Sequence, residues 1–288
     1  MCTTGAFLGT PDQGARYLLA FKTLDSGPTG VWHSIVRFSS GTRAMALGST
    51  GQQGINSGSN EHGLTVILSY LDVFVPDASM TVEDTMMLRA RDTRTLANAL
   101  LLDRCRTVAE GAAFLDDFFR RHPSAVGGNH ILADRSGVIG DFEHSGGERV
   151  FKELSADGLV GRGNDGCWVH LPAQRGLPEP IRRDRALRSS RVVETLAGLR
   201  ERQAGNAEAV VAIQRLLAEH GDGPQQPGSI CSHGVDVPGA RYATTASNAT
   251  SAAIVIDVFE GRMLYTAGAP CRSPWAELAL AEDVYAVT

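Results

Sequence analysis

Residues 107–143 read TVAEGAAFLDDFFRRHPSAVGGNHILADRSGVIGDFE, a helical pattern followed directly by a hairpin pattern. Thr107 and Glu110 form a capping-box signature at a helix start, and the apolar residues after them keep helical spacing to about Arg121. The rest holds two short apolar runs, NHILAD and VIGDFE, separated by the turn sequence RSG. This stretch therefore predicts that helices and antiparallel strands occupy separate blocks of the chain.

The residues on the N-terminal side repeat this separation of strands and helices. Short apolar or β-branched runs divided by Gly, Ser, Thr and Asp predict strands over 17–25, 31–37, 42–48 and 64–72. We interpret these strands as one meandering sheet, followed by helices over 83–104 and 107–121. A second sheet is expected to begin with the hairpin at 129, and strands over 150–154 and 157–162 could extend it.

The C-terminal half predicts two further helices and a closing strand pair. The helical patterns cover 181–202 and 206–219, and the strands cover 252–258 and 262–267. Segregated blocks favour an α+β fold of stacked antiparallel sheets covered by helices over a parallel doubly wound fold. Because the sequence holds neither an internal repeat nor a low-complexity linker, we expect residues 1–288 to form a single domain.

The composition excludes several classes of protein. Of the 288 residues 43% are hydrophobic and 20% are charged, which is ordinary for a globular enzyme and unlike a disordered, collagenous or membrane-embedded chain. A net charge of −5 argues against a nucleic-acid partner. No stretch approaches the ~18 apolar residues of a membrane span, and no signal sequence is apparent, so we expect no membrane partner.

The cysteines indicate a reducing, cytoplasmic location and no metal site. The five cysteines form no CxxC pair, and their odd number argues against a disulfide framework. Cys231 and His233 could ligate a metal, but they have no second ligand pair at suitable spacing. The GxG patterns near 161–166 lack a following helix, so they predict no dinucleotide site. We therefore expect neither a metal nor a cofactor.

Cys2 is the sharpest chemical feature of the sequence. Methionine before a small residue is normally removed, which would leave Cys2 with both a thiol and a free α-amine. Such an amine, with an ordinary pKa of about 7.7–8.0, can accept the proton of the thiol, so nucleophile and base would be one residue. The alternative is that Cys2 is simply the second residue of the chain.

Lys22 and Asp25 lie at the end of a predicted strand that could return beside the N-terminus. A cation there would favour a thiolate, and an anion would favour an ammonium, which are the two adjustments that an N-terminal cysteine nucleophile needs. The alternative is a solvated ion pair at a strand end.

A set of motifs in a fixed order supports the functional interpretation of Cys2. The motifs are Met1-Cys2-Thr3, LLAFKTLD, Gly54-Ile55-Asn56, Gly63-Leu64-Thr65-Val66, ILADRSGVIGDFE, Asn164, Ser229-Ile230-Cys231-Ser232-His233-Gly234, ATTAS, IVID and GAPC. In this order the chain resembles the N-terminal-nucleophile (Ntn) hydrolases of the choloylglycine hydrolase and penicillin acyltransferase group. The resemblance runs along the whole chain and implies a four-layer αββα sandwich.

The resemblance also implies a reaction. Cys2 would attack the carbonyl of a linear amide and form a thioester, Asn164 would stabilise the oxyanion, and Asp25 would orient the α-ammonium. Lys22 or Arg16 would supply positive potential. The acyl group of the thioester would then pass to water or to another amine, as in a hydrolase or an acyltransferase of small-molecule or secondary metabolism.

Several positions depart from the bile-salt enzymes of that group. Lys22 stands in place of Arg, Thr23 in place of Asn and Gly163 in place of Thr, and the LSYL segment lacks an oxyanion Asn, so bile salts are unsupported as substrates. We assign Tyr70, Asn56 and His233 to substrate binding. The departures leave open an alternative function, a non-catalytic scaffold or binding protein that keeps the fold.

The Arg-rich stretch 182–202 bears on partners. An exposed cationic helix could dock an acyl-carrier protein or the phosphates of coenzyme A as acyl donors, beside a small-molecule amide or thioester substrate. The alternative is a solvated face whose arginines pair with Asp184, Glu194 and Glu201. A homo-oligomer is compatible with the sequence.

Overall fold

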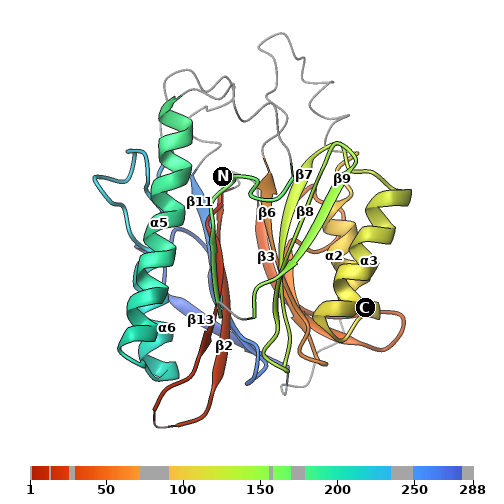
Figure 1. Ribbon diagram of the computed structural model, residues 1–288, viewed down its shortest axis with the longest axis horizontal. Helices are drawn as coiled ribbons and strands as arrows, with labels where there is room; N and C mark the ends of the chain where they lie inside the picture. The colour runs from red at the N-terminus through yellow and green to blue at the C-terminus, as the bar shows by residue number, and fades with distance from the viewer. Residues whose placement is uncertain are drawn as a thin grey trace.

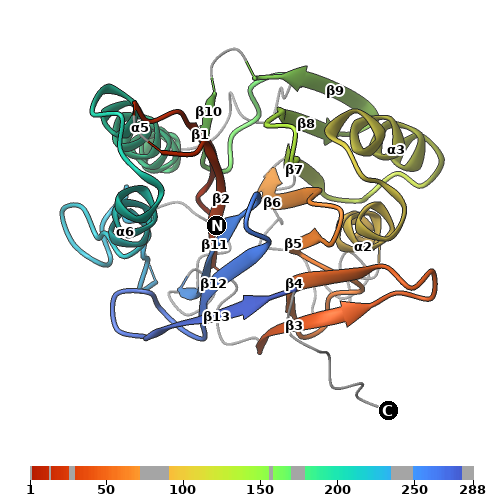
Figure 2. The same ribbon diagram turned by 90° about the horizontal axis from the view of Figure 1, so that it is seen from below.

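The computed structural model describes residues 2–12, 14–25, 30–71, 91–155, 158–169, 179–234 and 249–280. Within them the chain forms two antiparallel sheets that face each other, with helices on the outer face of each (Figures 1 and 2). This arrangement confirms the α+β prediction and the four-layer αββα sandwich.

The first sheet has six strands in the order β10-β1-β2-β11-β12-β13. Its strands in chain order are β1 (Thr4–Gly9), β2 (Tyr17–Asp25), β10 (Leu159–Arg162), β11 (Thr250–Asp257), β12 (Arg262–Thr266) and β13 (Trp275–Ala279). The N-terminal hairpin of β1 and β2 thus lies at the centre of the sheet, next to strands from the middle and the end of the chain.

The second sheet has seven strands in sequence order, β3 to β9. They are β3 (Val31–Arg37), β4 (Arg43–Ser49), β5 (Ser57–Asn60), β6 (Thr65–Leu71), β7 (Gly127–Ala133), β8 (Ile139–Ser145) and β9 (Glu148–Glu153). Every pairing is antiparallel, and the predicted hairpin at 129–143 is β7 with β8, joined by the turn whose Gly137 has φ of 90°.

The helices cover the two sheets in pairs. Among the described residues the helices are α2 (Arg94–Arg104), α3 (Val108–Arg121), α5 (Glu179–Glu201) and α6 (Asn206–Leu217). In Figure 1 α5 and α6 lie against the first sheet, and α2 and α3 against the second. Thr107 caps α3, because its hydroxyl accepts the Glu110 N–H, while the Glu110 carboxylate accepts the N–H of Arg106. The Glu110 carboxylate therefore binds the N–H of the residue before the N-cap, whereas a standard capping box would use the N–H of the N-cap itself.

Strand β2 shows how the layers are held together. Alternate residues of a strand point to opposite faces. Leu18 and Ala20 pack into the core between the sheets, whereas Leu19 and Phe21 pack against the α5 and α6 side. Burial on both faces explains the continuous apolar run of this strand. By the same alternation Lys22 belongs to the face between the sheets, where an ammonium is otherwise out of place.

Three predictions about the sheets were wrong. The strands predicted over 17–25 and 31–37 do not share a sheet, and the hairpin at 129–143 continues the sheet of β3 to β6 instead of starting another. Residues 159–162 do not extend that hairpin, because β10 pairs with β1. Of the helix predicted over 83–104, residues 83–90 lie outside the described residues, and the helix begins at Arg94.

Candidate active site

The N-terminal hairpin brings Cys2 beside the end of β2. Thr4 lies opposite Lys22 in the β1–β2 register. One residue further out, the Thr23 N–H donates to the Thr3 carbonyl at 2.9 Å, and the Thr3 N–H donates to the Thr23 hydroxyl at 3.1 Å. The predicted return of β2 to the N-terminus is therefore present, and Thr23 ties the segment that carries Cys2 to β2.

Cys2 is buried, with 6% of its surface exposed, and its backbone is held on both sides. Its nitrogen donates to Oδ1 of Asn164 at 2.9 Å, and its carbonyl oxygen accepts from Nη1 of Arg188 at 2.7 Å. Asn164 reaches this position because β10, two residues before it, pairs with β1, Arg162 lying opposite Thr4. The structure thus places the Asn164 amide on the Cys2 nitrogen.

Asn164 connects the two sheets. Its Nδ2 donates to the carbonyl oxygen of Tyr70 on β6 at 2.6 Å, while its Oδ1 also accepts from Nη2 of Arg188 at 3.2 Å. A primary amide has two N–H donors and an oxygen with two lone pairs. Three of these four groups are engaged in fixing the Asn164 amide between Cys2, Arg188 and Tyr70.

Arg188 is a site residue that the sequence did not reveal. It lies on the buried face of α5, where its guanidinium forms a 2.9 Å ion pair with Asp184, both side chains being 1% exposed. Burial disfavours the charge, but the ion pair and hydrogen bond with Asp184, together with the nearby Asp25, hold the pKa of Arg188 above its ordinary value. The available signal was the spacing of Asp184 and Arg188 by four residues, in phase with the buried Val192 and Leu199.

Lys22 is fully buried between the sheets. Its Nζ donates to Oδ1 of Asn56 at 2.6 Å and to the carbonyl oxygen of Leu68. Burial lowers the pKa of Lys22, and the nearby Cys2 and Asp25 oppose that effect. Asn56, which we predicted to bind substrate, is 4% exposed and holds the Lys22 ammonium in place.

Asp25 ends β2 and accepts a hydrogen bond from the hydroxyl of Thr250 on β11 at 2.7 Å. Burial raises the pKa of Asp25, and the Thr250 hydrogen bond partly offsets this. The Thr250 hydroxyl also accepts the N–H of Ser232, so Asp25 is linked to the segment that contains His233.

The structure brings together some of the predicted site residues and separates others. Tyr70 is partly buried, and its ring lies 5.0 Å from the Arg94 guanidinium carbon. Arg16 is exposed and lies just before β2. It is at one end of the hairpin and Lys22 is at the other, so Arg16 does not reach Cys2. A side chain six residues along a strand is roughly 20 Å away. Of the two predicted cations, only Lys22 is near the nucleophile.

His233 lies in a cluster with His220, Cys231 and Cys271. We call these four residues the Cys/His cluster. The expectation that Cys231 and His233 have no second pair of ligands is wrong, because residues 13 and 38 positions from His233 fold beside them. Sequence spacing missed the pair because His220 and Cys271 come from different loops.

The Arg-rich helix carries both exposed and buried arginines. Arg182, Arg183 and Arg200 are exposed, as both interpretations of the sequence expect, whereas two other arginines differ from both. Arg188 and Arg185 are 1% exposed and form ion pairs with Asp184 and Asp165, so neither is available for docking or belongs to a solvated face. The predicted pairing with Asp184 is present, but it is a buried pair. Among the described residues no helix is both long and apolar enough to cross a membrane.

Comparison with known proteins identifies the fold. No protein-family model and no curated protein matches the sequence. Solved structures that resemble this chain include penicillin V acylase from Agrobacterium tumefaciens, with a TM-score of 0.59 and 14% identity over 96% of this chain and 86% of that one. A Caenorhabditis elegans N-acylethanolamine-hydrolyzing acid amidase ortholog has a TM-score of 0.54 and 14% identity, over 90% and 93% of the two chains.

A mutant conjugated bile acid hydrolase from Clostridium perfringens is also similar, with a TM-score of 0.53 and 11% identity over 99% of this chain and 94% of that one. These proteins share the Ntn-hydrolase sandwich. The resemblance drawn from the sequence motifs is therefore confirmed at the level of the fold.

Proposed function

We propose that this chain is a thiol-dependent amidohydrolase that cleaves a linear amide through a thioester on Cys2. The observation that carries the proposal is the Cys2 nitrogen held by Asn164, beside the buried Lys22 and the partly buried Asp25. A cysteine that is placed only by chance at the start of a chain needs no such surroundings. The similarity in fold to amide-cleaving Ntn hydrolases supports the same conclusion.

The proposed reaction begins with removal of the residue before Cys2, which converts the Cys2 nitrogen to an α-amine. This amine takes the thiol proton, and the sulfur attacks the amide carbonyl carbon. The tetrahedral intermediate collapses as the C–N bond breaks and the α-ammonium gives its proton to the leaving amine. A water molecule then attacks the thioester, and the acid leaves as the thiol is restored.

The charges around Cys2 suit these steps. The Lys22 ammonium is fixed by Asn56 and the Leu68 carbonyl, so it can stabilise a thiolate without moving toward it. The Asp25 carboxylate, held by Thr250, complements the α-ammonium that forms during the reaction. Both charges are fixed in place before substrate arrives, which is the preorganisation that electrostatic catalysis requires.

Asn164 is the proposed oxyanion donor. One N–H of its Nδ2 donates to the Tyr70 carbonyl, and the second N–H is the group we assign to the oxyanion. Arg188 holds the same amide through Oδ1, so it acts as a positioning residue. The departure Gly163 fits this role, because the Arg185 carbonyl of α5 lies only 3.2 Å from where a Cβ at that position would be.

The acyl acceptor and the setting are part of the proposal. A second amine in place of water would make the chain an acyltransferase, and a thioester of coenzyme A or an acyl-carrier protein would serve as an alternative acyl donor. We assign the reaction to a small-molecule amide in secondary metabolism, in a reducing cytoplasm. The core between the sheets includes strands from both ends of the chain, which supports one domain over 1–288.

The first test is the intact mass of the purified protein, before and after treatment with a thiol alkylator and with a panel of linear amides and acyl thioesters. We expect loss of Met1 and a label or acyl adduct on Cys2, located by peptide mapping. The matched control is Cys2→Ala, which should lose turnover by roughly 10⁴-fold or more. Its melting temperature should change little, since only one sulfur atom is removed.

Three results would contradict the proposal. They are a retained Met1, a Cys2 that stays unlabelled while the exposed Cys167 reacts, and full turnover in Cys2→Ala. Retained Met1 with an unreactive Cys2 would favour the non-catalytic scaffold.

A further inference from the structure

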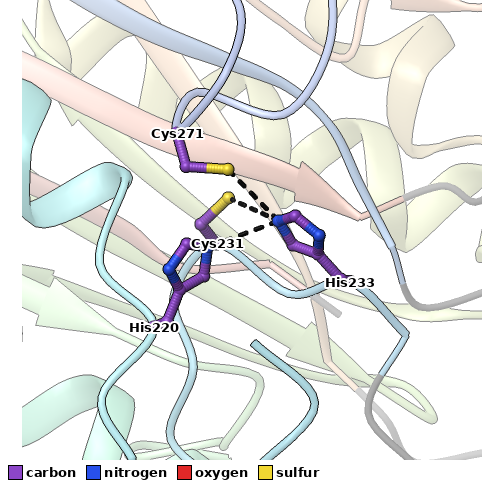
Figure 3. Close-up of side chains that lie close together, drawn as sticks. All are labelled: His220, Cys231, His233 and Cys271. Carbon is purple, nitrogen blue, oxygen red and sulfur yellow. Dashed lines mark hydrogen bonds between the residues drawn. The ribbon is translucent and has the colours of Figure 1, made fainter. Parts of the chain in front are cut away.

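The Cys/His cluster gathers four metal-ligating side chains from three loops. His220 follows α6, Cys231 and His233 lie on the segment before β11, and Cys271 lies in the turn between β12 and β13. Figure 3 shows the two sulfurs and the His220 ring surrounding Nε2 of His233. All four ligand atoms lie within 4.8 Å of one another.

The three distances from Nε2 of His233 to the other ligand atoms are close to those around a tetrahedral ion. Zinc bonds of about 2.3 Å to sulfur and about 2.05 Å to nitrogen place two nitrogens about 3.3 Å apart, and a nitrogen and a sulfur about 3.5 Å apart. In the structure the two Nε2 atoms of His220 and His233 are 3.3 Å apart. From Nε2 of His233 to the sulfurs of Cys271 and Cys231 the distances are 3.2 Å and 3.8 Å.

Hydrogen bonds alone cannot satisfy this arrangement. Nε2 of His233 faces Nε2 of His220 and two thiols, but one imidazole nitrogen carries either one proton or one lone pair. It can therefore make one good hydrogen bond among the three contacts. An ion at the centre of the four atoms would satisfy every one of them, because each would direct its lone pair to the same point.

The backbone holds the ligands in place before any ion binds. The Cys231 N–H donates to the Glu219 carbonyl at 2.9 Å, and the His233 N–H donates to the Pro224 carbonyl at 2.8 Å, so both lie against the loop that follows α6 and contains His220. The turn around Cys271 is closed by the Ser273 N–H on the Ala269 carbonyl at 3.0 Å. Because the three loops are already held in place, little conformational entropy is lost when an ion binds to the cluster.

We propose that His220, Cys231, His233 and Cys271 bind one Zn²⁺ ion in a closed structural site. Cys₂His₂ is a donor set that zinc favours, and four protein ligands leave no open position for catalysis. As the two S–Zn bonds form, each thiol releases its proton to solvent. Two thiolates then balance the charge of Zn²⁺, and the two imidazoles bind as neutral ligands.

The ion would fasten the C-terminal loops near the end of β2. Ser232, between two ligands, donates its N–H to Thr250, whose hydroxyl donates to Asp25. The proposed site therefore stabilises the segment next to Asp25 and does not itself touch Cys2. For this reason the zinc proposal does not depend on the proposed hydrolase activity.

The test is the metal content of the full chain, purified without a histidine tag and under reducing conditions, measured by inductively coupled plasma mass spectrometry. We expect about one zinc ion per chain in the wild type. Cys271→Ser and His220→Gln should lose most of it, and each should melt at a lower temperature. Cys167→Ser, which removes an exposed free cysteine outside the cluster, is the matched control and should retain the ion.

A second measurement covers the case in which the ligand variants do not fold. Zinc is removed from Cys2→Ala protein with a chelator and replaced by Co²⁺, which should give the visible bands of tetrahedral cobalt and thiolate-to-cobalt charge-transfer absorption. Absence of these bands overturns the proposal. So does wild-type protein without zinc that carries a Cys231–Cys271 disulfide, or zinc content unchanged in both ligand variants.

Discussion

The surroundings of Cys2 and the Cys/His cluster both gather polar atoms from distant segments of the chain, but the two regions satisfy those atoms differently. Around Cys2 the groups that would act on a substrate have protein partners, such as Asn164 between Cys2, Arg188 and Tyr70. In the Cys/His cluster one imidazole nitrogen faces three atoms that it cannot all bind. A site for a transient substrate is complete in the chain itself, whereas a site for a resident ion is completed by the ion.

The largest effect on stability should come from breaking the buried partners of the Cys2 side. Arg188→Met leaves Asp184 buried without its cation, which should lower the free energy of unfolding by about 3–5 kcal/mol. Arg202→Met is the control, because the Arg202–Glu208 pair is more than half exposed and should contribute less than about 1 kcal/mol. Urea unfolding of the two variants gives the comparison.

Arg188→Met should keep its zinc, because the cluster has its own ligands. Equal loss of stability in the Arg188 and Arg202 variants would show that the buried pair is not what holds the Cys2 backbone. Loss of zinc from Arg188→Met would show that the Cys/His cluster and the surroundings of Cys2 are not independent.

A smaller effect is expected from Asn164→Ala, which removes the proposed oxyanion donor. Loss of one such donor lowers kcat by about 10²–10³-fold. The KM should change little, because the hydrogen bond strengthens in the transition state. Asn206→Ala is the control, since its amide donates to Asp257, whose partner Leu19 lies toward the other end of β2. Steady-state kinetics with a substrate found by the mass experiment measures both, and a change in KM alone would place Asn164 in substrate binding.

Local sequence patterns predicted the elements of the fold better than their partners. The helix ending at Arg121 and the hairpin at 129–143 are present because caps, turns and periodicity act within a few residues. The pairing of β1 with β10 joins segments about 155 residues apart, and no local pattern records which strand a central strand will meet. The assignment of strands to sheets therefore failed where the elements themselves were predicted correctly.

The same distinction holds for the two sites. Lys22 and Asp25 were found because they share one strand with a return path to Cys2. Arg188 was missed because one arginine among many on a helix carries no mark of burial, and only the packing of α5 against β1 and β10 selects it. The Cys/His cluster was missed because its ligands become neighbours only after three loops have folded.

The smallest expected effect is the folding stability that is lost because the Asp25 carboxylate is removed from water near Cys2. Burial raises the pKa of Asp25 above its ordinary value of 3.8, so this carboxyl takes up a proton more readily in the folded protein than in the unfolded chain. The stability that this group contributes is fully present below pH 3.8 and is lost as the pH rises through the raised pKa.

Asp25→Asn tests this effect, because the asparagine keeps an oxygen that can accept from Thr250 but cannot ionise. The wild type should therefore lose stability relative to Asp25→Asn as the pH rises from 3.8, and the difference should level off once the folded carboxyl is ionised. Urea unfolding of both proteins across this range measures it. A difference that stays constant with pH would contradict this prediction. It would mean that the Asp25 carboxylate is as well solvated or paired in the folded protein as in the unfolded chain, so that its placement near Cys2 costs no stability.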